Sequence, residues 1–127
     1  KRADFVEGGA YNTLGLSALE AAIEPITRIG VESIFAHVQG YLDLLETGLL
    51  ERGFHSRRSG HDGGHSCILS VEPPGRDDAP RWVDALADRR ISCSSPDGLL
   101  RFAPHWPNAY DEVALVLDAI DAGLPAG

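Results

Sequence analysis

The sequence predicts an α+β domain of two layers, in which a small, mostly antiparallel sheet packs against helices. Three observations support this fold class. Apolar residues recur at helical spacing over residues 16–49, short apolar or alternating runs separated by turn residues follow, and helical patterns return at 78–90 and 108–123. The chain has 127 residues, 43% of them hydrophobic, which is enough for one domain with its own core.

The opening segment, residues 5–15, is rich in glycine and turn-forming residues and predicts a loop, where Asn12 or Thr13 can cap the next helix. Apolar residues at helical spacing predict a first helix over 14–30. Pro25 lacks an amide donor, so we expect it to kink this helix or to end its regular part.

A longer helix is predicted over residues 31–53, because one stripe of its surface is apolar and Gly53 provides a stop. Two glycines, Gly40 and Gly48, lie inside it. Each costs a helix up to about 1 kcal/mol relative to alanine, so we expect a neighbouring element to pack closely against them. The apolar stripe consists of Val31, Ile34, Val38, Leu42, Leu45 and Leu49.

Four short strands are predicted after this helix, at residues 54–58, 66–72, 91–94 and 99–103. The first two are separated by a polar, glycine-rich segment, which indicates a hairpin with a longer loop. Together the four strands should form one sheet that helices cover on one face.

Two further helices complete the predicted fold. Residues 78–90 begin with the acidic Asp78, continue with an apolar stripe and end with two arginines, a charge order that complements the helix dipole. Residues 108–123 predict the last helix, with Asn108 as its cap and Gly123 as its end.

Charge, cysteine content and the length of apolar runs limit the partners and the compartment that we expect for this protein. The net charge of −8 results from 19 acidic residues against 11 basic ones and argues against binding to nucleic acid. Cys67 and Cys93 lie in strand-like runs, which is typical of buried free thiols in a reducing compartment. No apolar run approaches the roughly 20 residues of a membrane span, and the N-terminal residues do not resemble a signal peptide. We therefore expect a cytoplasmic protein with no membrane partner.

Arg101 raises the question of function, because it lies inside the apolar run 99–103. A buried cation is costly without an anionic partner. Residue types alone leave two interpretations open. In the first, Arg101 has a structural role and pairs with an acidic side chain or points to solvent. In the second, it binds the carboxylate of a substrate, for which the planar guanidinium is well suited. Alternation along a strand directs it away from Leu100 and Phe102 but does not separate the two interpretations.

The residues around Arg101 resemble those of a known family. "ISCSSPDGLLRFAPHWPNAYDEVALVLDAID" contains an arginine-bearing strand, a short aromatic segment, an asparagine and an acidic helix start. It is similar to the end of class V aminotransferases, a branch of fold-type I pyridoxal phosphate (PLP) enzymes that includes cysteine desulfurases, selenocysteine lyases and kynureninase-like proteins. Residues 5–54 are similar to the start of that family's C-terminal domain, where a Glu-Gly-Gly segment precedes two helices. The resemblance thus covers essentially the whole chain.

The resemblance implies roles for several residues. Arg101 matches the arginine that holds the substrate α-carboxylate. Gly9 and Ala10 match the loop whose amides contact the cofactor phosphate of the neighbouring subunit, so the parent enzyme is expected to be a homodimer. The family has a threonine where this chain has Ala10, and a hydroxyl contact is therefore lost. Tyr11 or Thr13 could replace it.

The lack of a cysteine in one loop limits the reactions that the parent enzyme can be expected to catalyse. Desulfurases of this family carry their nucleophilic cysteine in a loop between the last strands, whereas the corresponding loop here, "SSPDG", has none. Cys93 precedes this loop and is expected to be a buried thiol with a raised pKa. Sulfur abstraction is therefore disfavoured, and transamination, lyase and epimerase chemistry stay open. His61 and His65 lie in a polar, glycine-rich hairpin tip, and no metal is expected there.

The resemblance also implies that the lysine that forms a Schiff base with PLP precedes this chain, since Lys1 is the only lysine present. We therefore expect residues 1–127 to be the C-terminal small domain of a larger PLP-dependent enzyme that acts on a small amino acid. Alone, the chain should contain no catalytic residue, bind no PLP and be inactive. The alternative is a free-standing binding module derived from this fold, with Arg101 as an anion anchor.

Overall fold

The computed structural model describes residues 12–75 and 78–124, without the side chain of Asp62. The chain divides into two compact units, residues 1–31 and 32–127, which are described separately. The predicted phosphate-contacting residues Gly9 and Ala10, and Tyr11 beside them, lie outside the described residues.

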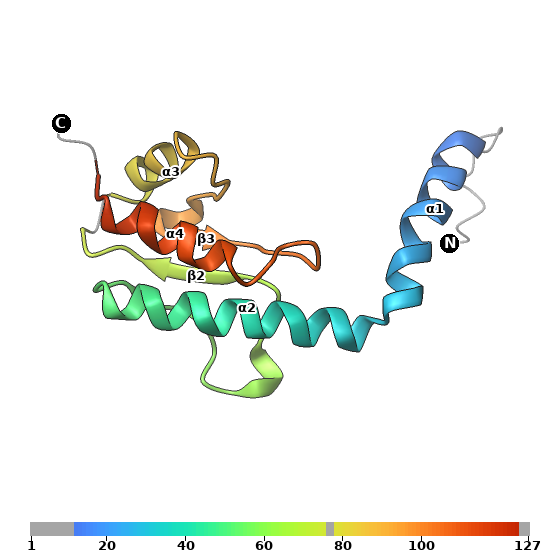
Figure 1. The fold of residues 1–127 in the computed structure, drawn as a ribbon, viewed down its shortest axis with the longest axis horizontal. Coiled ribbons are helices and arrows are strands. Elements are labelled where there is room, and N and C mark those ends of the chain that lie inside the picture. Colours follow the sequence, from blue (N-terminus) through green and yellow to red (C-terminus); the bar gives the residue numbers. More distant parts are fainter. Residues whose placement is uncertain (1–11, 76–77, 125–127) are drawn as a thin grey trace, which may run out of the picture. The chain divides into compact units, whose positions relative to one another are not determined.

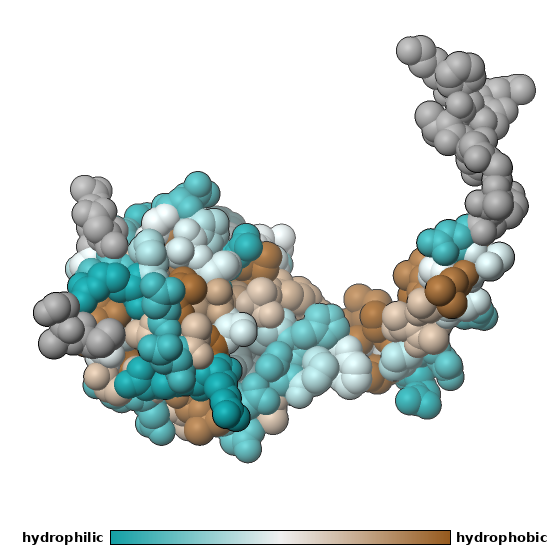
Figure 2. Space-filling model, turned by 90° about the horizontal axis from the view of Figure 1, so that it is seen from above, coloured by the Kyte–Doolittle hydropathy of each residue, from teal (hydrophilic) through white to brown (hydrophobic). Residues whose placement is uncertain are grey.

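The first unit contains helix α1 (Thr13–Ile29). Asn12 caps it as predicted, because its Oδ1 accepts a hydrogen bond from the Gly15 amide at 2.9 Å. The helix continues through Pro25, so the expected end at this residue is wrong. Proline removes only one amide donor, and the surrounding turns retain theirs. None of the described residues of α1 is buried, and both apolar and hydrophilic side chains lie on its surface (Figure 2).

The second unit confirms the α+β class: three helices accompany a three-stranded antiparallel sheet of order β1-β2-β3 (Figure 1). The elements in chain order are α2 (Val31–Glu51), β1 (His55–Ser56), the 3-10 turn η2 (Asp62–Gly64), β2 (Leu69–Glu72), α3 (Ala79–Ala87), the 3-10 turn η3 (Pro96–Gly98), β3 (Leu100–Phe102) and α4 (Glu112–Asp121).

One face of the sheet is apolar and the other is polar. Leu69 pairs with Phe102 and Val71 with Leu100, and all four side chains are buried. They belong to one core cluster with residues of α2, α3 and α4, as expected for a sheet covered by helices on one face. This cluster includes Val38, Leu42, Leu45 and Leu49 of the predicted stripe, whereas Val31 at the start of α2 is exposed.

The predicted strand at 91–94 is reduced to a single bridge between Ser94 and Arg101, which corrects the four-strand prediction. The residues before Ser94 are committed to the end of α3: Arg90 has φ 63°, and the Ile91 amide donates to the Leu86 carbonyl of that helix at 2.9 Å. The segment that starts at Ile91 therefore begins as a helix end and reaches the sheet only at Ser94.

The ends and glycines of the long helix α2 follow the prediction. Gly53 has φ 80°, and the Phe54 amide donates to the Leu49 carbonyl at 3.1 Å, the bond of a Schellman motif. A Cβ at Gly48 would collide with the Leu117 side chain of α4, and one at Gly40 would collide with the hydroxyl of Tyr110. The close packing predicted at these two glycines is therefore confirmed.

Asn108 does not cap the last helix, contrary to the prediction. Helix α4 begins at Glu112 with Asp111 in the cap position. The Asn108 Oδ1 accepts a hydrogen bond from the His105 amide at 2.8 Å, and its Nδ2 donates to Glu112 at 2.8 Å. The side-chain oxygen is thus used to close the preceding turn and is not available to the helix amides.

The two cysteines form no disulfide, as predicted, but both are half-buried where full burial was expected. In the part of the chain that the structure describes, no helix has the length and apolar character needed to cross a bilayer.

Candidate functional site

The polar face of the sheet carries the predicted site residue Arg101. Arg101 pairs with Ser70 of β2 on one side and with Ser94 on the other. Arg57 extends this row, because its amide donates to the Ser70 carbonyl at 2.9 Å. Paired residues of a sheet project from the same face, so Arg101 stands between two small neutral side chains.

The guanidinium of Arg101 is exposed, and its Nε donates a hydrogen bond to the Ser94 hydroxyl at 3.2 Å. No acidic side chain among residues 12–75 and 78–124 pairs with it. Glu72, the carboxylate that β2 contributes to this face, instead pairs with Arg57 at 2.5 Å. The exposure expected of Arg101 is therefore observed, and its positive charge is available to an anion. Its role as a substrate clamp stays a prediction.

An open groove of about 880 Å³ lies elsewhere in the second unit, and Arg101 is not among its lining residues. Arg89 and Arg90 line it together with Glu112 and Asp118, so the groove does not favour one sign of charge. Burial and the nearby carboxylate of Glu112 raise the pKa of Tyr41 in its wall above the ordinary value. Sequence patterns could not reveal this groove, because its walls come from separate segments of the chain.

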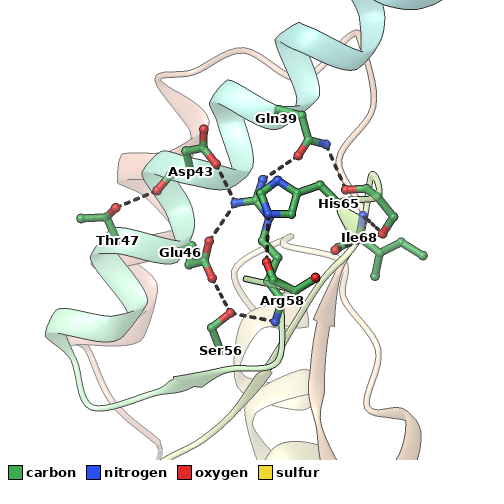
Figure 3. A network of polar contacts seen from close by, with 10 residues as sticks. Gln39, Asp43, Glu46, Thr47, Ser56, Arg58, His65 and Ile68 are labelled. Carbon is green, nitrogen blue, oxygen red and sulfur yellow. Dashed lines mark hydrogen bonds and ion pairs between the residues drawn. The ribbon is translucent and has the colours of Figure 1, made fainter. Parts of the chain in front are cut away.

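Arg58, an arginine that the sequence did not single out for this role, connects the β1 region to α2 through a side chain that is largely shielded from solvent (Figure 3). Only 6% of its side chain is exposed. It donates to Asp43 at 2.6 Å, to Glu46 at 2.8 Å and to Gln39 at 2.6 Å. Burial alone would lower the pKa of Arg58, but hydrogen bonds to Glu46 and Asp43 outweigh it and raise the pKa. We interpret this cluster as structural, because both terminal nitrogens of Arg58 are paired with side chains of the same domain.

Both cysteines lie on the core side of the sheet. Cys67 shares the strand parity of Leu69, and Cys93 precedes the outward-facing Ser94, so alternation directs both away from the polar face. Both pack against the core cluster. Burial raises the pKa of the Cys93 thiol to about 11, which keeps it protonated near neutral pH. Neither thiol is placed to act on a ligand of Arg101.

The thiol of Cys93 is expected to alkylate slowly at neutral pH. Because its pKa is raised to about 11, the thiolate fraction should grow with pH and reach half only near that value. Peptide mass spectrometry after timed iodoacetamide treatment across a pH series would measure this profile. A midpoint at or below about pH 8 would instead indicate a stabilised thiolate and would support a catalytic role for Cys93.

His61 and His65, the histidines of the hairpin tip, do not form part of a metal-binding cluster among the described residues. His65 Nε2 bonds to the Ser59 carbonyl at 3.0 Å. No group of three metal-binding side chains occurs among the residues that the structure describes.

The described residues do not fit covalent binding of PLP, because they include no lysine. Lys1, Gly9 and Ala10 lie outside them. The residues described here can therefore contribute an arginine and a polar surface to a site, but not the covalent anchor of this cofactor.

Comparison with solved structures agrees with this architecture. The apo structure of the cysteine desulfurase from Thermococcus onnurineus NA1 superposes with a TM-score of 0.86 at 21% sequence identity, covering 98% of this chain and 34% of that protein. A NifS-like protein gives a TM-score of 0.77 at 20% identity, covering 91% of this chain and 34% of its own length. No family model and no curated protein sequence matches the chain.

These likenesses show the fold: the chain is folded like one part of a cysteine desulfurase or NifS-like protein. The fold predicted from the resemblance to class V aminotransferases is thereby confirmed. The chain spans about a third of the length of the solved proteins that it matches.

Proposed function

We propose that residues 1–127 form the C-terminal small domain of a PLP-dependent enzyme with the class V aminotransferase fold, and that Arg101 binds the α-carboxylate of its amino-acid substrate. The observation that carries this proposal is the state of Arg101: an exposed arginine on the open face of the sheet, without an acidic partner among the described residues. A guanidinium of this kind suits a carboxylate, which it can bind through two parallel hydrogen bonds.

The contribution of this domain would be to hold the substrate. A carboxylate fixed on a rigid strand loses its freedom to rotate, which favours one orientation of the reacting bond at the cofactor. PLP, when bound by the rest of the enzyme, supplies the electron sink for chemistry at the amino-acid carbons. The strand is held by Leu100 and Phe102, whose side chains are buried in the core directly beneath the polar face.

The reaction that we favour is amino-group transfer or a related lyase or epimerase reaction on a small amino acid. The solved relatives include a cysteine desulfurase, a type of enzyme that requires a reactive cysteine. In this chain the turn Pro96–Gly98 contains no cysteine, and Cys93 is half-buried on the core side with a raised pKa. Sulfur abstraction by a cysteine of this domain is therefore not proposed.

We further propose a homodimeric parent located in the cytoplasm. The free, half-buried thiols of Cys67 and Cys93 support a reducing compartment. The dimer follows from the resemblance, in which the loop containing Gly9 and Ala10 reaches the cofactor phosphate of the neighbouring subunit.

The proposal is tested by comparing the 127-residue chain with the protein encoded by its complete reading frame. The complete protein should purify with PLP and transfer or rearrange the amino group of a small amino acid. The 127-residue chain mixed with PLP should show no turnover, and borohydride trapping should label only Lys1 or the amino terminus, slowly. A stoichiometric adduct with turnover in the short chain would contradict the proposal. A complete reading frame that encodes no lysine-bearing domain would favour the free-standing binding module.

A further inference from the structure

Ser94 and Arg101 face each other as a closed antiparallel pair. The Arg101 amide donates to the Ser94 carbonyl at 2.7 Å, and the Ser94 amide donates to the Arg101 carbonyl at 3.2 Å. Residues that exchange both backbone hydrogen bonds carry neighbouring side chains on the same face. The turn Pro96–Gly98, closed by the Leu99 amide bonding to the Pro96 carbonyl at 3.0 Å, joins the two and fixes their separation.

The contact between the two side chains determines which edge of the guanidinium is free. An arginine can bind a carboxylate either through its side edge, formed by Nε and one terminal nitrogen, or through its end edge, formed by both terminal nitrogens. The Ser94 hydroxyl accepts a hydrogen bond from Arg101 Nε at 3.2 Å and so occupies the side edge. Within the described part of the chain, neither terminal nitrogen is paired with a carboxylate. The end edge is therefore the one presented to a ligand.

A second serine provides an internal comparison. Ser70 is paired with Arg101 from the opposite side of the strand. Its hydroxyl has no hydrogen-bond partner among the described residues, so it flanks the guanidinium without holding it. Ser70 and Ser94 thus lie on the same face of the sheet and both flank Arg101. They differ in that only the Ser94 hydroxyl contacts Arg101 Nε.

The geometry assigns Ser94 as the positioning residue of Arg101: its hydroxyl holds Nε so that the two terminal nitrogens bind a carboxylate end-on. This inference rests on the proposed function of Arg101 and adds a second residue and a binding geometry to it. The role of Ser94 is to keep the charged fork in one orientation, which reduces the entropy lost when a substrate binds. Ser94 itself does not transfer a proton.

The first test uses the 127-residue chain labelled with ¹⁵N in its arginines. The Arg101 Nε–H signal, assigned by its loss in Arg101→Lys, should exchange with water about fivefold faster in Ser94→Ala than in the wild type, the effect of losing one ordinary hydrogen bond. Ser94→Thr should restore the slow exchange, and Ser70→Ala should leave it unchanged. Equal exchange in the wild type and in Ser94→Ala would overturn the assignment.

The second test uses the complete enzyme and separates this inference from the function on which it rests. Ser94→Ala should raise KM for the amino-acid substrate about fivefold, while kcat changes less than about twofold, because Ser94 orders the guanidinium before binding and the bound carboxylate keeps its contact with Arg101. Ser94→Thr should restore KM, and Ser70→Ala should match the wild type. If Ser94→Ala leaves KM unchanged while Arg101→Ala lowers kcat/KM, Ser94 has no positioning role and the proposed function stands. If neither substitution changes kcat/KM, the carboxylate site itself is wrong.

Discussion

Replacing Arg101 by alanine in the complete enzyme is expected to lower kcat/KM about 100-fold, or about 3 kcal/mol, the scale of losing a desolvated, charge-assisted pair. The expectation follows from the position of this arginine, which is exposed on the polar face of the sheet without an acidic partner in the described chain. PLP absorbance should stay intact, because Arg101 is assigned to the substrate carboxylate and the described residues include no lysine that could bind the cofactor covalently. Steady-state kinetics and absorbance spectra of the purified variant measure both quantities.

The substrate itself provides the sharpest control for this experiment. An amine that lacks the α-carboxylate should react equally slowly with the wild type and with Arg101→Ala, since the contact that the substitution removes is absent from both complexes. Arg101→Lys should recover only part of the loss, because an ammonium is a point charge and cannot bind a carboxylate through a fork. Arg52→Ala removes a partly buried arginine that pairs with the exposed Asp121, away from the row of Arg101, and should leave kcat/KM unchanged. An Arg101→Ala enzyme with wild-type kcat/KM would refute the carboxylate site.

The fold was predictable where local signals and burial agree. The stripe of Val38, Leu42, Leu45 and Leu49 is buried in one face of α2, and Gly53 ends that helix in the left-handed conformation that glycine adopts readily. The apolar alternation that predicted β3 also holds, since Leu100 and Phe102 are buried and Arg101 is exposed between them. In these elements the spacing of apolar residues along the sequence matches the spacing of buried side chains in the helix or strand.

The predictions failed where a single local signal competed with its surroundings. Pro25 was expected to kink the first helix or to end its regular part, and the second alternative is wrong, because the loss of one amide donor does not outweigh the remaining turns of α1. Asn108 is a good helix cap by residue type, yet its side-chain oxygen bonds to the His105 amide and the helix begins at Glu112. Competition of this kind among hydrogen-bond donors cannot be resolved from residue types alone.

The site was predictable only in part. The residues around Arg101 predicted an arginine on a strand, and alternation predicted its direction. The contact with Ser94 depends on how the turn Pro96–Gly98 returns the chain, and the availability of Arg101 depends on Glu72 being paired with Arg57. Both depend on pairing between residues separated in the chain, which a single sequence does not encode as a local pattern.

The largest effect on stability is expected at Arg58. Arg58→Ala should lower the free energy of unfolding of the 127-residue chain by about 3 kcal/mol, the usual scale for removing one partner of a buried ion pair. The Arg58 side chain is 6% exposed and that of Glu46 is 20% exposed, so the substitution leaves a carboxylate that water reaches poorly and that has lost its cation. Gln39 on α2 also loses the donor to its side-chain oxygen. Urea denaturation followed by circular dichroism measures the change.

Two companion variants separate a buried charge pair from simple loss of contact at Arg58. Asp43→Ala should cost less than about 1 kcal/mol, because Asp43 is 63% exposed and a surface pair contributes little. The double variant Arg58→Met with Glu46→Leu should recover most of the stability lost in Arg58→Ala, since well-packed apolar residues often replace a buried ion pair without cost. The Arg58 Nε strengthens this expectation, as it is buried without a hydrogen-bond partner among the described residues and so adds a desolvation cost to the native pair. A double variant as unstable as Arg58→Ala would show that the network contributes through its specific hydrogen bonds, and that the connection it makes between β1 and α2 cannot be replaced by packing alone.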